Sequence, residues 1–131
     1  MPGWGVIPTI RIRDMAEALA LYTGPLEFSL ERGAADEGNC ALVRGDARLM
    51  LETPSGFYGD EYDAAIEDRL GSKSANALYI EATDVDGFYD RVRTAGVRVV
   101  DPLAERPWGQ REFTVEDHVG NWLTFWAAAA G

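Results

Sequence analysis

The stretch DMAEALALY at residues 14–22 is followed seventy positions later, at residues 84–92, by DVDGFYDRV. In both stretches the apolar residues follow the i, i+3, i+4, i+7 spacing of one helical face: Met15, Ala18, Leu19 and Tyr22, then Val85, Phe88, Tyr89 and Val92. Each set is preceded by an aspartate that can cap the first helical turn, Asp14 or Asp84. The repeat predicts two similar halves, with a cleft between them as the place to look for function.

Segments with strand character flank both helices. In the first half we expect strands at 6–12, 26–31, 39–44 and 47–52, the last two forming a hairpin around Gly45-Asp46. In the second half we expect strands at 76–82, 97–100, 111–116 and 122–127, the last two again forming a hairpin. Each half therefore runs strand, helix, strand, strand, strand. The predicted fold class is α+β: paired βαβββ modules forming a curved eight-stranded mixed sheet, with helices on its outer face.

Residues 55–75 connect the halves. Apolar periodicity fails there and Gly and Ser are frequent, with a short helix from Tyr62 to Leu70 as one option. We expect one domain over residues 1–131, made of pseudo-repeats at about 1–54 and 76–131. A half of about 65 residues would be marginally stable alone, so the halves are expected to share one structure.

Composition favours a soluble globular protein. Hydrophobic residues make up 47% of the 131 residues, and the longest apolar run, at 122–130, is much shorter than the roughly 20 residues of a membrane-spanning helix. No basic segment followed by an apolar stretch opens the chain, so we expect a cytoplasmic location. The net charge of −10 disfavours nucleic acid as a partner, because neutralising phosphates requires clustered Lys and Arg.

Cys40 and His118 are the residues that nucleophilic or acid–base chemistry would use first. Cys40 lies in an apolar stretch, and we interpret it as a small buried side chain. His118 lies in the hairpin turn at 117–121, where a solvent-exposed position is expected. No nucleophile, general base and orienting partner can be assembled from the motifs, so we predict no catalytic residue.

Two segments near the C-terminus carry a resemblance to a known family. PWGQREF at 107–113 and DHVGN at 117–121 closely resemble the C-terminal hairpin of the bleomycin-resistance proteins, which belong to the glyoxalase and dioxygenase superfamily called vicinal oxygen chelate. IPTIRIRD at 7–14 is similar to that family's first strand and helix cap, and residues 41–46 and 76–80 also fit it. The resemblance covers nearly the whole chain except residues 53–75.

The resemblance implies a set of positions for metal ligands. The metal-dependent enzymes of the superfamily place four ligands on four cavity strands, at positions that match Ile7, Glu52, Ala77 and Thr124. Only Glu52 offers a charged oxygen, whereas a catalytic metal usually takes about three protein ligands or more. We therefore expect no metal and no other cofactor, and the metal enzymes are disfavoured.

The alternation of side chains along strands extends these positions to a whole cavity face. Their neighbours two residues away would also point inward: Thr9, Arg11, Arg48, Met50, Tyr79, Glu81, Trp122 and Trp126, with Glu112 joining from the next strand. The opposite faces are apolar: Ile10, Ile12, Leu49, Leu51, Leu78, Ile80, Leu123 and Phe125. The inward set combines aromatic rings with carboxylates, which suits a flat cationic ligand.

The resemblance also implies roles for single residues. Trp108 matches the tryptophan that stacks against the planar rings of the drug, and Asn39 stands where the drug-binding relatives carry a second aromatic. Phe57, on the connection, either replaces that aromatic or packs under its own loop. Pro8 matches the hinge of an N-terminal strand that the resistance proteins exchange in their dimers, and Trp4 would lie on that arm.

These observations predict a non-catalytic binding protein that sequesters a basic aromatic antibiotic of the bleomycin type, as a homodimer with exchanged N-terminal strands. The expected ligand-binding residues are Trp108, Glu52, Trp122, Thr124, Tyr79, Glu81, Glu112, Met50, Asn39 and Phe57, while Trp126 faces either the ligand or the dimer partner. The alternatives are a divergent metal-dependent lyase or dioxygenase, which would bind metal tightly, and a binder of another small metabolite. We expect no nucleic-acid or membrane partner.

Overall fold

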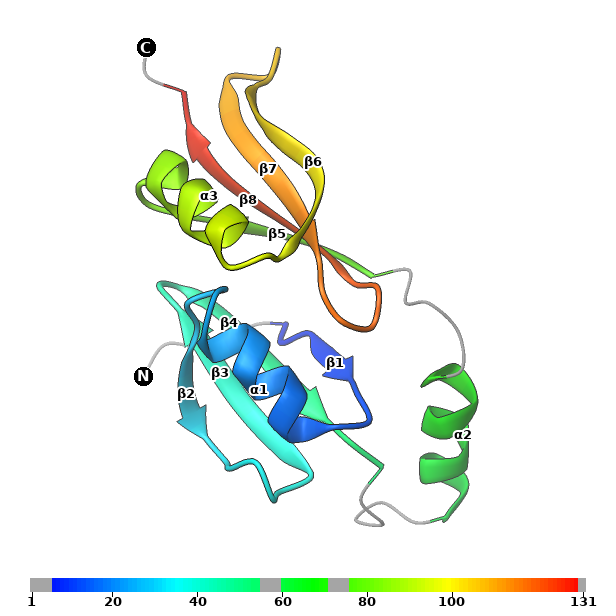
Figure 1. Cartoon of the computed structure of the whole chain (residues 1–131). Coiled ribbons are helices and arrows are strands. Elements are labelled where there is room, and N and C mark those ends of the chain that lie inside the picture. Colours follow the sequence, from blue (N-terminus) through cyan, green and yellow to red (C-terminus); the bar gives the residue numbers. More distant parts are fainter. Residues whose placement is uncertain (1–5, 55–59, 71–75, 130–131) are drawn as a thin grey trace. The chain divides into compact units, whose positions relative to one another are not determined.

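The computed structural model describes residues 6–54, 60–70 and 76–129, which belong to two compact units (Figure 1). The first unit spans Met1–Ser72 and the second spans Lys73–Gly131. Within the described residues, each unit contains a four-stranded mixed sheet, and the strands are accompanied by three helices in all. The predicted α+β class is confirmed, with the eight strands divided equally between two open sheets.

The first sheet has the spatial order β1 (Thr9–Arg11), β4 (Ala47–Glu52), β3 (Asn39–Arg44) and β2 (Ser29–Arg32). β1 runs parallel to β4, and the other neighbours are antiparallel. The first helix, α1 (Met15–Thr23), begins where the sequence predicts, because the Asp14 carboxylate accepts a hydrogen bond from the Glu17 backbone N–H at 3.1 Å. The connection contains α2 (Asp60–Leu70), which starts two residues before the expected helix.

The second sheet repeats this arrangement as β5 (Ala77–Glu81), β8 (Trp122–Ala128), β7 (Gln110–Glu116) and β6 (Arg98–Glu105). β5 runs parallel to β8, and the other neighbours are antiparallel. Asp84 caps α3 (Val85–Thr94) by accepting a hydrogen bond from the Gly87 N–H at 3.3 Å. The same strand order and the same helix position in both units confirm the internal repeat.

The core of each unit lies between its sheet and its capped helix, α1 or α3 (Figure 1). The apolar faces predicted from the alternation are buried to 6% exposure or less: Ile10, Ile12, Leu49, Leu51, Ile80, Leu123 and Phe125. Leu78 is the exception, being only half-buried near the start of the edge strand β5. In the second unit Phe88 of α3 meets Phe125 edge-on, with ring centroids 4.8 Å apart.

Several strand boundaries differ from those expected, and the differences at β2 and β6 have a visible cause. Residues 26–28 fold back on α1, where the Leu26 and Phe28 N–H groups donate to Leu21 and Tyr22, so β2 begins only at Ser29. β6 continues through Pro102 to Glu105, because the ladder with β7 shifts register between Asp101 and Ala104. A proline at such an irregularity does not interrupt a required ladder hydrogen bond.

Gly24 explains why α1 stops where it does. A Cβ atom at this position would lie 2.5 Å from the Ala20 carbonyl oxygen, which belongs to the helix backbone. Only glycine permits that approach, so the chain leaves the helix at the residue after Thr23.

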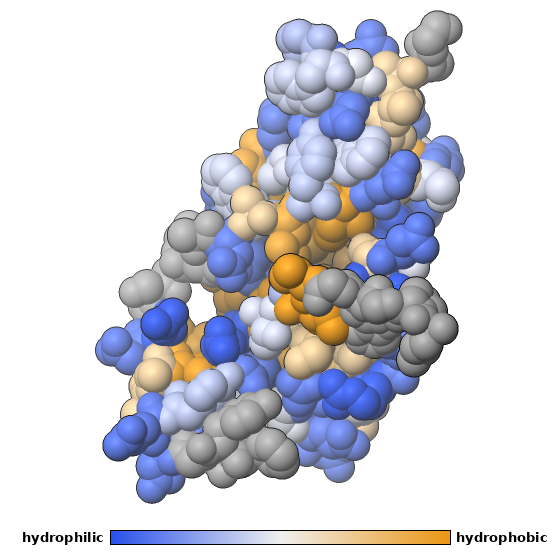
Figure 2. Space-filling view, turned by 180° about the vertical axis from the view of Figure 1, so that it is seen from behind, coloured by the Kyte–Doolittle hydropathy of each residue, from blue (hydrophilic) through white to orange (hydrophobic). Residues whose placement is uncertain are grey.

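Hydrophilic residues cover most of the face seen in the space-filling view, with apolar residues in smaller patches (Figure 2). None of the described helices is long and apolar enough to cross a membrane.

Replacing Phe125 by alanine is expected to lower the free energy of unfolding by about 3–5 kcal/mol, because it removes a fully buried ring that contacts Phe88 and Phe113. Chemical denaturation followed by circular dichroism measures this loss. Leu30→Ala is the control, since Leu30 is 43% exposed and should cost less than about 0.5 kcal/mol. Equal losses in the two variants would contradict the packing described.

Cys40 is fully buried, as predicted, and burial raises the pKa of its thiol. The thiolate fraction at neutral pH is therefore smaller than that of a free cysteine, and the sulfur is out of reach of solvent. Labelling with Ellman's reagent should be far slower in the folded protein than in urea. Equally rapid labelling of both forms would show that Cys40 is accessible and reactive.

Candidate functional site

The expected ligand-binding residues that belong to strands lie on the sheet face opposite α1 in the first unit and opposite α3 in the second, whereas Trp108 lies in the loop between β6 and β7. The first group contains Glu52, Met50 and Asn39, and the second contains Trp108, Glu112, Tyr79, Thr124, Trp122 and Glu81. Phe57 and Trp4 lie outside the described residues. For the strand residues, the observed face is the one that the alternation predicts, and the two groups differ in the partners of their carboxylates. Their role in ligand binding stays a prediction.

Strand register places the strand residues of the second group in three neighbouring rows. Each row consists of three residues that lie opposite one another on β5, β8 and β7. The rows are Glu81–Trp126–Glu112, Tyr79–Thr124–Thr114 and Ala77–Trp122–Glu116. The middle row is held together by the Thr114 and Thr124 hydroxyls, whose oxygens are 2.7 Å apart. Aromatic and acidic side chains thus occupy the rows on both sides of a pair of threonines.

Glu112 is the centre of a hydrogen-bonded cluster on this face. The residue is only 7% exposed, and its Oε1 accepts a hydrogen bond from the Trp108 indole N–H at 2.9 Å. The Tyr79 hydroxyl donates to the same oxygen, and it also lies 2.7 Å from the Gln110 Oε1. Trp108 and Tyr79 remain 62% and 54% exposed, so two open rings flank a buried carboxylate.

The Tyr79 phenol is held in its protonated form. Its partial burial, and then its hydrogen bond to the Glu112 carboxylate, raise its pKa above the ordinary value. Both causes disfavour the phenolate, because burial penalises any charge and the carboxylate repels a second negative charge. The hydroxyl therefore remains a hydrogen-bond donor at neutral pH.

Trp126 extends the aromatic surface beside this cluster. Its ring stacks on that of Tyr79, with centroids 6.0 Å apart and planes 20° from parallel. Glu81 is exposed on the edge strand next to it, and Glu112 is on its other side in the same row. The surface around Trp126 is therefore both aromatic and acidic.

Gln110 was missed by the sequence analysis. It lies two residues before Glu112, inside the PWGQREF segment, so the same alternation that selected the other inward residues points to it. The signal was present, but β7 was expected to begin only at Arg111, one residue too late.

Trp122 belongs to a separate contact. Its indole N–H donates to Glu116 Oε1 at 3.2 Å, and Glu116 also forms an ion pair with Arg98 at 3.1 Å. Trp122 is 46% exposed, two rows away from Glu112. It lies on the same face as Trp108, but its carboxylate partner is already neutralised.

Glu52 is buried and engaged within the first unit. Its Oε2 accepts a hydrogen bond from the Tyr62 hydroxyl at 2.9 Å and lies 3.3 Å from Arg11 Nε. Arg11 donates in turn to the Tyr62 oxygen at 2.9 Å, and this bond is the main cause that raises the pKa of its guanidinium. The negative charge of Glu52 is therefore balanced by this chain's own arginine.

Tyr62 was not expected to reach this site. It occurs near the start of the acidic helix α2, and four residues further on Ile66 is the buried residue of that helix. Residues spaced i and i+4 share one helical face, which was the available sign that Tyr62 faces the protein.

The other residues of the first group are also held by local contacts. Asn39 Oδ1 accepts a hydrogen bond from Arg32 at 2.5 Å, and Asn39 is in register with Glu52. Met50 is half-buried, and its backbone N–H donates to the Pro8 carbonyl at 2.9 Å. The dimer with exchanged N-terminal strands, for which Pro8 is the expected hinge, stays a prediction.

The four positions that match the superfamily's metal ligands do not fit a metal ion. Ile7 and Ala77 have no donor atom in their side chains, and the Thr124 hydroxyl is bonded to Thr114. The charge of Glu52 is already paired with the Arg11 guanidinium. Among the residues that the structure describes, no group of three or more His, Cys, Asp or Glu is placed to hold a metal.

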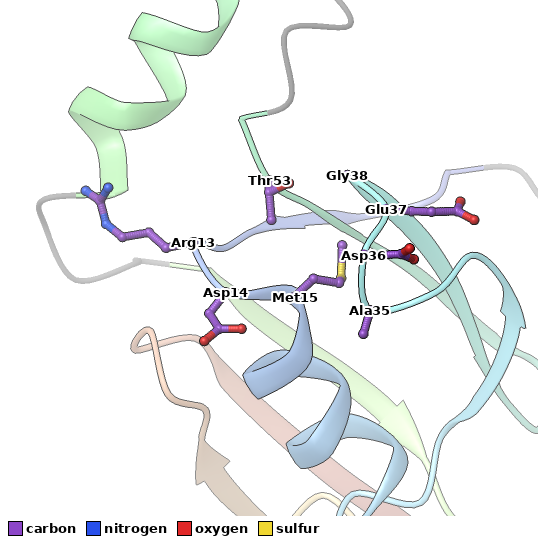
Figure 3. A pocket seen from close by; sticks show the side chains of 8 residues that line it. All are labelled: Arg13, Asp14, Met15, Ala35, Asp36, Glu37, Gly38 and Thr53. Atoms are coloured by element: carbon purple, nitrogen blue, oxygen red, sulfur yellow. The ribbon is translucent and has the colours of Figure 1, made fainter.

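A pocket of about 510 Å³ lies at the start of α1 in the first unit. Its lining is Arg13, Asp14, Met15, Ala35, Asp36, Glu37, Gly38 and Thr53 (Figure 3). Asp14 is occupied as the cap of α1, and Arg13 extends toward α2, where it pairs with Glu67. The lining is largely polar, but it contains no aromatic ring on which a flat ligand could stack, so we do not assign the pocket as the binding site.

Solved structures with the same fold include proteins from several bacteria. TioX from Micromonospora sp. ML1 is 20% identical, with a TM-score of 0.69 over 95% of this chain and 99% of that chain. A member of the glyoxalase/bleomycin resistance protein/dioxygenase superfamily from Sphaerobacter thermophilus DSM 20745 is 21% identical, with a TM-score of 0.66 over 93% and 96%. A bleomycin-binding protein complexed with bleomycin is 20% identical, with a TM-score of 0.62 over 92% and 95%.

Sequence comparison gives the family. A search of curated proteins returned no significant match. The profile of the glyoxalase/bleomycin resistance protein/dioxygenase superfamily matches residues 7–125, which is most of the chain and includes both repeats. The chain therefore belongs to the glyoxalase/bleomycin resistance protein/dioxygenase superfamily.

Proposed function

We propose that this protein binds a flat, cationic aromatic molecule of the bleomycin type and sequesters it without chemical change. The observation that carries the proposal is the cluster on the second sheet, in which Trp108 and Tyr79 present exposed rings beside the buried carboxylate of Glu112. An exposed ring offers a stacking surface, and the carboxylate attracts positive charge.

Several attractive contributions favour a flat cation at such a site. An aromatic face attracts a cation by roughly 0.5–2 kcal/mol, and stacked rings add about 0.5–1.5 kcal/mol beyond the buried area. Charge attraction strengthens where the ligand excludes water from Glu112. The acidic surface, with a net charge of −10, also favours the approach of a cation.

Sequestration needs no reactive group, and the described residues offer none in a suitable arrangement. Cys40 is buried with a raised pKa, and His118 is exposed in the turn after β7. Likeness of fold to a bleomycin-binding protein makes metal-free bleomycin the first probe to use, and another cationic aromatic metabolite is the next.

Trp108→Ala should weaken the binding of metal-free bleomycin by about 1–3 kcal/mol, because it removes the exposed ring on which the drug would stack. Trp108→Phe is the matched variant, since it keeps an aromatic face but loses the hydrogen bond to Glu112. It should retain much of the affinity. Calorimetric titration of the three EDTA-treated proteins gives the comparison, with thermal unfolding as the control for folding.

Unchanged affinity in Trp108→Ala would remove this residue from the site. Absence of binding to the unaltered protein would exclude bleomycin and leave the fold assignment standing.

Adding Mn²⁺, Ni²⁺ or Zn²⁺ to EDTA-treated protein should leave the thermal unfolding midpoint unchanged, because Glu52 is already paired with Arg11. A metal enzyme behaves otherwise. A metal ion that binds only the folded protein, at a free concentration 100 times its dissociation constant, stabilises the folded state by about 2.7 kcal/mol. A midpoint raised by several degrees with one of these ions would favour the lyase or dioxygenase alternative.

A further inference from the structure

Glu112 is a buried carboxylate whose hydrogen-bond donors are all neutral. Both the Trp108 indole N–H and the Tyr79 hydroxyl donate to Oε1, while Oε2 receives no hydrogen bond from the residues that the structure describes. Burying a carboxylate without a cationic partner is unfavourable, and two neutral donors on one oxygen only partly offset that cost. One oxygen of Glu112 therefore remains available to a positively charged donor.

The arginines of the second sheet do not supply that charge. Each is held by a different carboxylate: Arg106 by Asp101 at 2.6 Å, Arg111 by Asp86 at 2.6 Å, and Arg98 by Glu116 at 3.1 Å. Arg111 follows Gln110 and precedes Glu112 on β7, so its side chain points to the opposite face of the sheet. Arg106 is near enough to act electrostatically on the Tyr79 hydroxyl. Among the described residues, however, no arginine forms a hydrogen bond or an ion pair with Glu112.

Glu116 is an internal comparison for Glu112. It lies on the same strand and the same face, and it also accepts a hydrogen bond from an indole, that of Trp122. The difference is that Glu116 has Arg98 as an ion-pair partner. Among the described residues, the sheet therefore contains two similar carboxylate–indole pairs, of which the one at Glu112 lacks an ion-pair partner.

We infer that the Glu112 carboxylate binds a protonated nitrogen of the ligand, in an ammonium, amidinium or guanidinium group, while the ligand's ring system lies against Trp108 and Tyr79. This inference rests on the proposed function and narrows its ligand class. Because Glu112 is within hydrogen-bond distance of both side chains, the positive charge must lie on or directly beside the flat ring. A charge on a flexible tail would reach it only where the tail folds back beside the ring.

Two dyes of the same shape test the inference. 9-Aminoacridine carries a positive charge on its ring system near neutral pH, whereas acridine is neutral there. We expect the unaltered protein to bind 9-aminoacridine roughly 10-fold more tightly or better, the scale of a hydrogen bond to a charged group. Glu112→Gln should abolish this preference while keeping the weaker, shared affinity for the ring. Fluorescence titration of the dyes measures both affinities.

Glu116→Gln is the matched control, because it removes the same net charge from the same strand but from a carboxylate that Arg98 already balances. It should keep the preference for the cation. Thermal unfolding of both variants shows whether either has lost its fold.

The outcomes separate this inference from the proposed function. If both dyes bind the unaltered protein with equal affinity, or if Glu112→Gln keeps the preference, the role of Glu112 is wrong while ring binding stands. If Glu116→Gln removes the preference as well, general surface charge explains it and the inference also fails. If neither dye nor bleomycin binds, the proposed function fails and the inference fails with it.

Discussion

The pairing of β7 with β8 is the constraint on which the candidate site depends. One face of this antiparallel pair must bury Phe113 and Phe125 beneath α3, where both rings contact Phe88. Because strand side chains alternate between faces, every second residue is then turned away from the core. That single choice of register places a glutamate, a threonine pair and a tryptophan together on the other face. A slip of one residue would exchange the two sets, so the hydrophobic core fixes the composition of the site.

Much of this arrangement could be predicted from the sequence because it follows from periodicity. The repeat of the helical pattern gave both halves, and the alternation of apolar residues gave the buried faces with the exception of Leu78. The site contacts could not be obtained in this way. Trp108 lies between β6 and β7, outside either periodic pattern, and its hydrogen bond to Glu112 depends on the loop conformation. Only the resemblance to the resistance proteins indicated that residue.

Contacts between segments distant in the chain were the second feature that could not be predicted from the sequence. Tyr62 lies in a connection whose periodicity is weak, and its bond to Glu52 joins α2 to the end of β4. The sequence identified Glu52 as an inward carboxylate and therefore as a possible attractor of cations. It could not show that Arg11, on the neighbouring strand β1, and Tyr62 already occupy that carboxylate. The inward orientation of a strand carboxylate follows from the alternation of side chains. Its availability to a ligand depends on which long side chains of the protein already contact it.

The two repeats use equivalent rows for opposite electrostatic arrangements. The row Arg11–Glu52–Asn39 in the first sheet corresponds to the row Glu81–Trp126–Glu112 in the second. The central residue of each row accepts a backbone hydrogen bond from the residue that follows the edge strand: Glu52 from Ile12, and Trp126 from Ala82. In the first row a cation neutralises the central carboxylate. In the second row an aromatic ring stands between two carboxylates, with no basic side chain in the row. The second sheet, and not the first, is therefore the one to which we assign the proposed binding of a cationic ligand.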